Sequence, residues 1–190
     1  MIYFTSDLHF CHNKPFIYED RGFKSIEEHD AAIIKNWNSI VKDEDMVFIL
    51  GDLMLNDNRE GIKKINQLNG NISIILGNHD TPTRINIYKD ELMKVCSITY
   101  ADEIRYQGYN FFLCHYPLET ENLDDRGMKH TLINLHGHTH SKAIFTNGYP
   151  YKYNVALDAH NMYPVSIDNI IEDIKREVYT NVSNIIKDIK

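Results

Sequence analysis

The stretch Ile72-Ser73-Ile74-Ile75-Leu76-Gly77-Asn78-His79-Asp80 decides the fold of this chain. Its first five residues form a short apolar run of the length expected for a buried strand. Gly, Asn, His and Asp then follow in succession, and packing alone does not explain four polar or flexible residues at that point. In open α/β sheets, ligands bind at the edge formed by the carboxyl ends of the strands. The stretch therefore predicts a strand over residues 72–76 that leads into a functional loop.

Four other apolar runs end in the same way. They are residues 2–6 before Asp7-Leu8-His9, 46–50 before Gly51-Asp52, 111–114 before His115, and 132–135 before His136-Gly137-His138-Thr139-His140. Imidazole and carboxylate groups suit first-row divalent metals, and the absence of paired cysteines argues against a structural zinc site. The recurrence predicts one metal-bearing active site assembled from five loops.

Each cluster on its own also has a structural explanation. Asp7-Leu8-His9 could be a strand end with a local Asx turn, Gly51-Asp52 is a common turn dipeptide, and His115 could be a hydrogen-bonded core histidine. The runs after residues 76 and 136 are more specific, because closely spaced polar residues of this kind after a strand seldom arise from packing. The coincidence of all five clusters favours function.

Composition narrows the class of protein. The 190 residues, 43% of them hydrophobic, suffice for one compact domain over residues 1–190. A formal net charge of −7 disfavours a general nucleic-acid binder, which needs a basic surface. No apolar stretch is long enough to span a membrane, and the first residues lack the features of a signal peptide. Three cysteines without CxxC spacing fit a reduced, cytoplasmic setting.

Helix and strand patterns alternate in the first half of the chain. Ser25 and Glu28 have the spacing of a capping box, and the apolar residues that follow predict a helix of about four turns before residue 46. Ile62, Ile65 and Leu68 mark a shorter helix, closed by Asn69-Gly70. Strand, helix, strand, helix and strand in this order imply parallel pairing with right-handed crossovers.

The second half is richer in strands. The pattern predicts strands at residues 98–100, 104–106 and 109–114 with a hairpin turn at Gln107-Gly108, and at 143–146 and 151–157 with a turn at Asn147-Gly148. An apolar stripe predicts a C-terminal helix over about residues 167–188. These elements indicate a layered α/β domain with mixed sheets and its polar loops along one edge.

The five clusters together resemble the calcineurin-like metallophosphoesterase family, which is marked by D-x-H, G-D, G-N-H-D/E, a lone H and G-H-x-H. The resemblance runs from residue 2 to about residue 164 and implies an α-β-β-α sandwich. Flanking residues resemble a small, single-domain bacterial and phage branch. Cys11 departs from that branch, which usually has glycine there, and Gly22 stands where proline is common.

The resemblance implies a site with two divalent ions. One ion would be held by Asp7, His9, Asp52 and His140, and the other by Asp52, Asn78, His115 and His138, with Asp52 bridging. The pair would acidify a shared water to a hydroxide that attacks phosphorus in line. His79 would protonate the leaving oxygen or hold the phosphate, and Asp80 would orient and charge its imidazole. Mn²⁺ is the expected metal, with Fe, Ni and Zn as alternatives.

Four residues are weaker candidates. His12 and Asn13 are expected to line the substrate pocket, and Arg21 would either clamp a phosphate or be a solvated charge. His136 is expected to have a structural or supporting role, because a histidine two residues before a ligand histidine usually points away from the metal.

The expected activity is that of a phosphodiesterase acting on a small nucleotide or similar metabolite. The alternatives are a phosphomonoesterase or protein phosphatase, and a non-catalytic binding scaffold on the same fold. Scaffolds of this kind tend to lose ligands or the histidine of the G-N-H-D run, whereas this chain keeps His79 and every matched ligand. A small phosphorylated substrate is expected, with no membrane partner, and long nucleic acid is disfavoured. The identity of the substrate and the oligomeric state stay open.

Overall fold

The structure is a computed structural model that describes residues 1–119, 132–148 and 150–188, with the backbone alone for residues 181–188. The strands are β1 Ile2–Thr5, β2 Met46–Leu50, β3 Asn71–Ile75, β4 Val95–Thr99, β5 Ala101–Tyr106, β6 Tyr109–Cys114, β7 Leu132–His136, β8 Lys152–Asn154 and β9 Val165–Ser166. The helices are α1 Pro15–Tyr18, α2 Ile26–Ile40, α3 Asn58–Ile65, α4 Pro82–Glu91 and α5 Ile167–Asp188, with 3₁₀ turns at Thr146–Gly148 and Leu157–Ala159.

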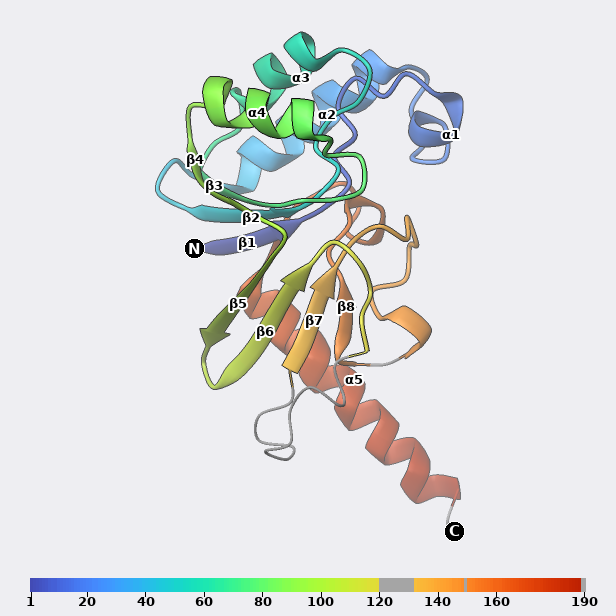
Figure 1. Cartoon of the computed structure of the whole chain (residues 1–190). Helices are drawn as coiled ribbons and strands as arrows, with labels where there is room; N and C mark the ends of the chain where they lie inside the picture. The colour runs from blue at the N-terminus through green and yellow to red at the C-terminus, as the bar shows by residue number, and fades with distance from the viewer. Residues whose placement is uncertain (120–131, 149, 189–190) are drawn as a thin grey trace.

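The strands form two mixed sheets. The first has the order β4-β3-β2-β1-β9, in which β1 to β4 are parallel and β9 is antiparallel to β1. The second has the order β5-β6-β7-β8, in which β5 and β6 form an antiparallel hairpin and the other pairs are parallel. Helices α2, α3 and α4 lie over one side of the first sheet, and α5 runs along the second sheet on the far side of the molecule (Figure 1). The predicted fold class, a layered α/β domain with mixed sheets, is confirmed.

Two hydrophobic clusters hold these layers together. One joins α2, α3 and α4 to the first sheet, and Trp37 lies at its centre, fully buried, with its indole N–H donating to the Asn69 carbonyl at 2.9 Å. The other fills the space between the sheets and includes Phe4, Phe48 and Phe111, together with the apolar stripe of α5. Burying one such aromatic or aliphatic side chain contributes about 1.5–3 kcal/mol, so the stacking of the sheets is set by these residues.

Helix α2 begins where the capping pattern predicts. The Ser25 hydroxyl accepts a hydrogen bond from the Glu28 N–H at 3.3 Å, as an N-cap should. The return bond differs from a standard capping box, because the Glu28 carboxylate accepts from the N–H of Lys24 instead of Ser25, at 2.8 Å. The cap therefore orders one residue more of the loop before the helix.

Some expected elements differ from the structure. The hairpin at Gln107-Gly108 is confirmed, with φ of 48° and 82° at the two turn residues. The strand expected over residues 143–146 is wrong: Phe145 makes only an isolated bridge with Tyr153. The Asn154 side-chain amide donates to the carbonyls of residues 141 and 143, and its backbone N–H donates to the Ile144 carbonyl, so the segment is held by contacts to this one residue and not by a regular ladder. Helix α3 ends at Ile65, earlier than Leu68, and α4 was not expected.

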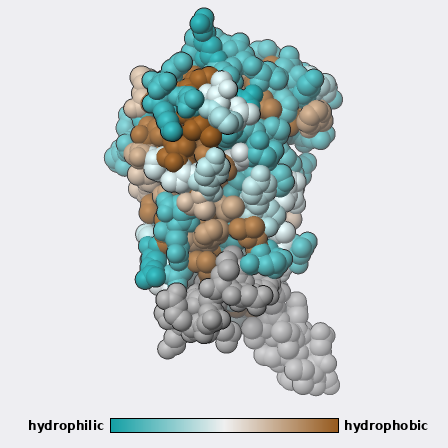
Figure 2. All heavy atoms as spheres, in the orientation of Figure 1, coloured by the Kyte–Doolittle hydropathy of each residue, from teal (hydrophilic) through white to brown (hydrophobic). Residues whose placement is uncertain are grey.

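Hydrophobic side chains gather in the upper part of the face in Figure 2 and again lower down, at the level of the second sheet. In the region of α4 and β4, Leu92, Val95 and Ile98 line a shallow depression. Strand β4 is the edge of the first sheet, so the side chains of Val95 and Ile98 are flanked by a neighbouring strand, β3, on one side only. Within the described residues, no helix is long and apolar enough to cross a membrane.

Candidate metal centre

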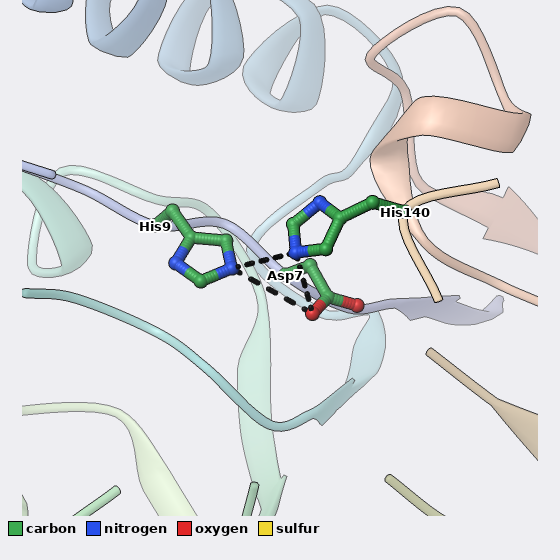
Figure 3. A group of neighbouring side chains, drawn as sticks. All are labelled: Asp7, His9 and His140. Carbon is green, nitrogen blue, oxygen red and sulfur yellow. Dashed lines mark hydrogen bonds and ion pairs between the residues drawn. The ribbon is translucent and has the colours of Figure 1, made fainter. Parts of the chain in front are cut away.

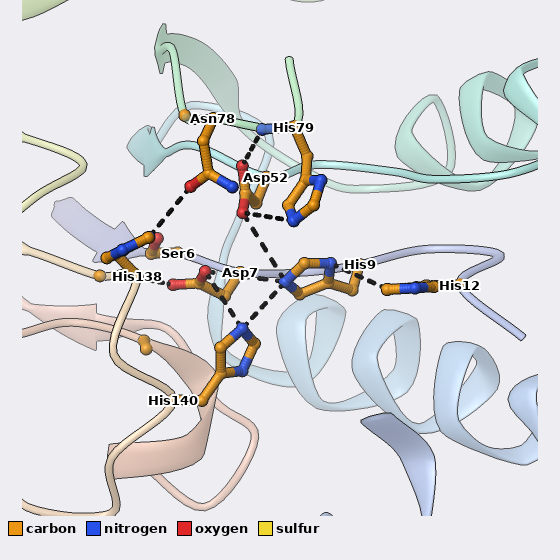
Figure 4. Close-up of polar contacts among 12 residues, drawn as sticks. Ser6, Asp7, His9, His12, Asp52, Asn78, His79, His138 and His140 are labelled. Carbon is orange, nitrogen blue, oxygen red and sulfur yellow. Dashed lines mark hydrogen bonds and ion pairs between the residues drawn. The ribbon is translucent and has the colours of Figure 1, made fainter. Parts of the chain in front are cut away.

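The predicted ligand residues follow the carboxyl ends of strands from both sheets. In the first sheet, Asp7 and His9 follow β1, Asp52 follows β2, and Asn78 and His79 follow β3. In the second sheet, His115 follows β6, and His138 and His140 follow β7. Parallel strands end at a common edge, so the two sheets bring their loops to one place (Figure 4).

Three glycines let these loops approach one another. A Cβ on Gly137 would overlap the Ser6 hydroxyl and the Asp7 carboxylate, and a Cβ on Gly77 would overlap the Asp52 carboxylate. A Cβ on Gly51 would crowd the His115 ring and the backbone of Gly77. Each motif glycine is therefore required by close packing at the site.

The backbone is strained at most of the predicted ligands. Five of them lie in the left-handed region, which non-glycine residues rarely adopt: Asp7 at φ 58°, His9 at 50°, Asp52 at 58°, His138 at 69° and His140 at 49°. Such strain costs of the order of 1–3 kcal/mol per residue and clusters at functional sites, where the surrounding structure enforces it. Positive φ angles therefore occur at five of the residues that the motifs predict to be ligands.

Asp7, His9 and His140 form one group of converging donors (Figure 3). The Nε2 atoms of His9 and His140 are 3.1 Å apart, and each lies 3.7 Å from the Asp7 Oδ1. The Asp7 Oδ1 is buried and has no hydrogen-bond partner in the described part of the chain. A buried carboxylate oxygen without a partner is costly unless a cation binds there. The donor set therefore fits a metal ion.

The protonation of these groups agrees with such a site. Burial lowers the pKa of His9 to about 4, which keeps the imidazole neutral and able to donate a lone pair. Burial favours the protonated form of Asp7, but the interactions with His9, His115 and His140 outweigh it and lower the pKa of this carboxyl. A neutral imidazole and an ionised carboxylate are the forms that bind metal.

Asp7, Asp52 and His115 form a second group. The His115 Nδ1–H donates to the Leu50 carbonyl at 2.7 Å, so its Nε2 carries a lone pair. That lone pair faces two oxygens: Asn78 Oδ1 at 2.9 Å and Asp52 Oδ2 at 3.6 Å. Electron pairs that point at one another repel unless a cation lies between them, so this group also fits a metal.

Asp52 lies between the two groups, and His138 lies beside the second. The Asp52 Oδ2 is 3.6 Å from the His115 Nε2 and 3.9 Å from the His9 Nε2. Burial raises the pKa of Asp52 to about 6, with the charges of Asp7 and Asp80 acting in the same direction. The His138 Nδ1 is 3.0 Å from Asn78 Oδ1. All seven predicted ligands are thus brought together.

His79 lies at the mouth of the site. Its ring is 42% exposed, and its Nε2 is 3.9 Å from the Asp52 Oδ2. Its backbone N–H donates to the other Asp52 oxygen at 2.9 Å. The ring is therefore near the ligand groups but remains open to a substrate.

Asp80 does not orient the His79 ring, which corrects the expectation for this residue. Its carboxylate accepts from the N–H groups of Asp52 at 2.9 Å and Gly77 at 2.8 Å and from the Tyr88 hydroxyl at 2.7 Å. None of its hydrogen bonds or ion pairs within the described residues reaches the His79 imidazole. Asp80 instead ties the loop after β3 to the loop after β2 and to α4, and so places Asp52.

Asp158 supports the site and was missed from sequence. Its Oδ2 is 3.3 Å from the His140 Nδ1, so the His140 Nδ1–H faces a carboxylate and its Nε2 faces the metal position. Arg21 holds Asp158 through two contacts, from Nε at 3.0 Å and from Nη2 at 2.7 Å. Asp158 directly follows the apolar run that ends at Leu157, which is the same sequence pattern as in the five clusters.

Arg21 differs from both alternatives considered for it. Its side chain is only 2% exposed, so it is not a solvated charge. Besides Asp158, its guanidinium donates to the Asp7 carbonyl at 2.8 Å and lies 2.9 Å from the His29 Nε2. Every guanidinium nitrogen therefore already has a protein partner, which leaves little capacity to clamp a phosphate.

The remaining weak candidates differ in whether they line the pocket beside the site. His12 lines the pocket beside the site, with its Nδ1 3.3 Å from the His9 Nδ1, and burial lowers its pKa to about 4. Asn13 is exposed and is not among the residues that line that pocket. The buried His136 contacts the Gly137 carbonyl at 2.9 Å and the Thr146 hydroxyl at 2.9 Å, in a purely supporting position.

The two departures from the family pattern have a backbone explanation. Cys11 has φ 63°, a value that glycine would adopt without strain. Gly22 has φ 86°, which proline cannot adopt, so the loop after Arg21 takes a path that excludes the usual residue.

Comparisons with known proteins agree with this geometry. A family model described as the calcineurin-like phosphoesterase superfamily domain matches residues 1–155, a range that includes every predicted ligand. An uncharacterized protein of Methanocaldococcus jannaschii is 35% identical over 181 residues, 92% of each chain. The Gene 66 protein of Mycobacterium phage D29 is 31% identical over 204 residues, which cover 92% of this chain and 97% of that protein.

One solved structure shares the fold. A protein of unknown function from Aquifex aeolicus superposes with a TM-score of 0.70 at 24% sequence identity. The match covers 90% of this chain and 98% of that one. The similarity concerns the fold alone.

Proposed function

Because this chain belongs to the calcineurin-like phosphoesterase superfamily, we propose that it is a two-metal phosphodiesterase that acts on a small nucleotide or a similar phosphorylated metabolite. The observation that carries the proposal is the convergence of unpaired electron pairs at one point. The buried Asp7 Oδ1 has no hydrogen-bond partner among the residues that the structure describes, and the His9 and His140 Nε2 atoms face each other at 3.1 Å. Without cations this arrangement is unfavourable, and with them each donor is satisfied.

We assign the ions to the two donor groups. Asp7, His9, Asp52 and His140 would hold one ion, and Asp52, Asn78, His115 and His138 the other. Asp52 is the shared ligand, since its Oδ2 lies within 4 Å of a histidine from each group. Nitrogen and oxygen donors of this kind suit Mn²⁺, and also Fe, Ni or Zn, because geometry and availability select among them.

The residues would divide the chemistry between them. When bound, the ions supply an acidified water as nucleophile and neutralise charge on the phosphoryl oxygens. His79, whose ring is open to the pocket, would give a proton to the leaving oxygen or bind the phosphate. Asp80 would act indirectly, by fixing the backbone at Asp52 and Gly77.

Two alternatives are kept. A phosphomonoesterase or protein phosphatase would use the same ions and the same ligand residues. A non-catalytic scaffold would not need His79 or the unpaired Asp7 oxygen. The free thiols of Cys11, Cys96 and Cys114 suit a reducing compartment, and we propose a cytoplasmic location.

Hydrolysis of bis(4-nitrophenyl) phosphate tests the proposal. Protein stripped of metal and reloaded with Mn²⁺ should release 4-nitrophenol, and a chelator should abolish the release. Asp52→Asn is the matched variant, because it keeps the shape of the side chain and removes the charge shared between the two groups. A fully loaded protein that hydrolyses neither this diester nor the corresponding monoester would contradict the enzyme assignment.

A further inference from the structure

A pocket of about 640 Å³ opens from the candidate metal centre. It begins at His9, His79 and His140 and extends toward α1 and the loop after His140. Sites for small molecules commonly occupy about 300–1,000 Å³, so the pocket has room for an organic group beyond the phosphate. None of the second ion's proposed histidines, His115 and His138, lines it.

One wall of this pocket is apolar. It consists of Phe16, Ile17 and Leu55. Helix α1 buries Ile17 to 6% exposure but leaves Phe16 61% exposed, so the helix is anchored by one side chain and presents the next to the pocket. The His12 ring meets Phe16 edge to face, at a centroid distance of 5.7 Å and an angle of 88°. An edge-to-face contact with one neighbour, together with the 61% exposure, leaves the Phe16 ring able to stack on a ligand.

The pocket also contains the proposed proton donor. His79 lies in its lining, and a proton donor must be close to the oxygen that leaves. The group that fills this pocket is therefore the leaving group of the ester. An aromatic group satisfies the Phe16 ring through stacking, whereas a small or charged group would leave the apolar wall against water.

The pocket lining also includes two side chains of opposite charge. Asp20 and Lys142 both line the pocket, and among the described residues the side chain of neither forms a hydrogen bond or an ion pair. One offers an acceptor and the other a donor. A heteroaromatic ring has an apolar face and polar edges, which matches this combination better than a purely hydrocarbon group does.

We propose that this pocket binds a planar aromatic leaving group and that Phe16 determines the preference for it. The inference rests on the proposed function, because it identifies the leaving-group side by the position of His79. It adds a substrate class and a specificity-determining residue outside the motifs of the family.

Binding of two phosphonates to Mn²⁺-loaded protein tests the inference by calorimetry. Phenylphosphonate should bind about tenfold more tightly than methylphosphonate, as expected when an aromatic ring stacks on a side chain. Phe16→Ala should abolish this preference and leave methylphosphonate binding unchanged, and Phe16→Tyr should retain it. Met93→Ala is the control, since Met93 is 74% exposed and precedes β4, at the opposite end of the parallel strands.

The outcomes are distinct from those for catalysis. A preference that survives in Phe16→Ala, or a wild-type protein that binds neither phosphonate or shows no preference, would overturn the inference. Binding requires no turnover. A protein that prefers phenylphosphonate through Phe16 but hydrolyses no diester would support the pocket assignment and contradict the proposed activity.

Discussion

At the scale of single residues, the orientation of a predicted ligand histidine depends on a partner that is close in space. The His140 Nδ1 is 3.3 Å from Asp158, and this contact fixes which nitrogen faces His9 and Asp7. The hydrogen bond to Asp158 also raises the pKa of His140, so a proton competes with a cation for this ring when no metal is bound. Asp158 in turn is held by Arg21.

Asp158→Asn should weaken the binding of Mn²⁺ by about 10–100-fold, the usual effect of losing a carboxylate that supports a metal-bound histidine. Calorimetric titration of metal-free protein measures it. Asp43→Asn is the control, because Asp43 is an exposed acid in an ion pair with Lys94, on the loop before β2. Unchanged affinity in Asp158→Asn would show that His140 is oriented without this carboxylate.

His79→Asn should retain both ions and lose about 10²–10⁴-fold in kcat, the range expected when a general acid is removed. His115→Asn should instead lose metal, because the His115 Nε2 lies within 3.6 Å of Asp52. Metal content by mass spectrometry, measured beside kcat, separates the two roles. If His79→Asn loses its metal, His79 is a ligand and the proposed division of roles is wrong.

The strained backbone at His138 gives another residue-scale prediction. His138→Gly and His138→Ala remove the same ring, but only glycine adopts φ 69° without strain. The glycine variant should be more stable than the alanine variant by about 1 kcal/mol in metal-free protein, as measured by urea denaturation. Equal stabilities would mean that the loop relaxes when the ring is removed.

At the scale of elements, two sheets approach each other through a loop that has no room for a side chain. Gly137 leads out of β7 and lies against Ser6 and Asp7 at the end of β1. The adjacent N–H of His138 donates to the Asp7 Oδ2 at 2.9 Å, so the two strand ends are also hydrogen-bonded.

Gly137→Ala should destabilise the protein by about 1–3 kcal/mol, the usual cost of overpacking, and should also weaken metal binding because Asp7 must move. Thermal denaturation and Mn²⁺ titration measure the two effects. Gly148→Ala is the control: no atom lies within 4 Å of its Cβ position, so it tests backbone strain without a clash. A Gly137→Ala variant with normal metal affinity would show that Asp7 is not displaced.

The sequence predicted elements and sites best where local pattern and tertiary structure agree. Met46–Leu50 is a strand as expected, and the five clusters lie at strand ends because parallel strands share one edge. Helix α4 was missed because its apolar residues form no clear stripe. The interaction of Asp80 with Tyr88 and two backbone N–H groups could not be deduced, because neighbours in sequence suggested His79 as its partner.

At the scale of the whole molecule, several histidines are buried without charge. Burial lowers the pKa of His29, His136 and His160 below the usual value of about 6.5. Below that pH the unfolded chain takes up protons that the folded protein does not, so stability must fall as the pH falls. Above about pH 6.5 these groups are neutral in both states and their contribution is constant.

The free energy of unfolding of metal-free protein should therefore decrease between about pH 6.5 and 5, by up to about 1.4 kcal/mol per pH unit for each such group. Asp52 and His140 act in the opposite direction, since the pKa values of both are raised, whereas His9 and His12, with pKa values lowered to about 4, act in the same direction as these three histidines. Urea denaturation at several pH values measures the slope. His160→Gln should make it shallower, because an amide can replace the donor to the Asn154 carbonyl. A slope of the opposite sign would contradict the burial of these rings as neutral groups.

The distance along the chain between the two halves of the metal centre sets the order of events during synthesis. His9 and His140 are 3.1 Å apart in space but 131 positions apart in sequence. At roughly 5–20 residues per second, several seconds pass on the ribosome between the emergence of one and of the other. Strand β1 stays an open edge for longer still, until Val165 arrives to pair with Phe4. A nascent chain lacks the donors of the second sheet at first, so we expect the candidate metal centre to be complete only after both sheets have formed.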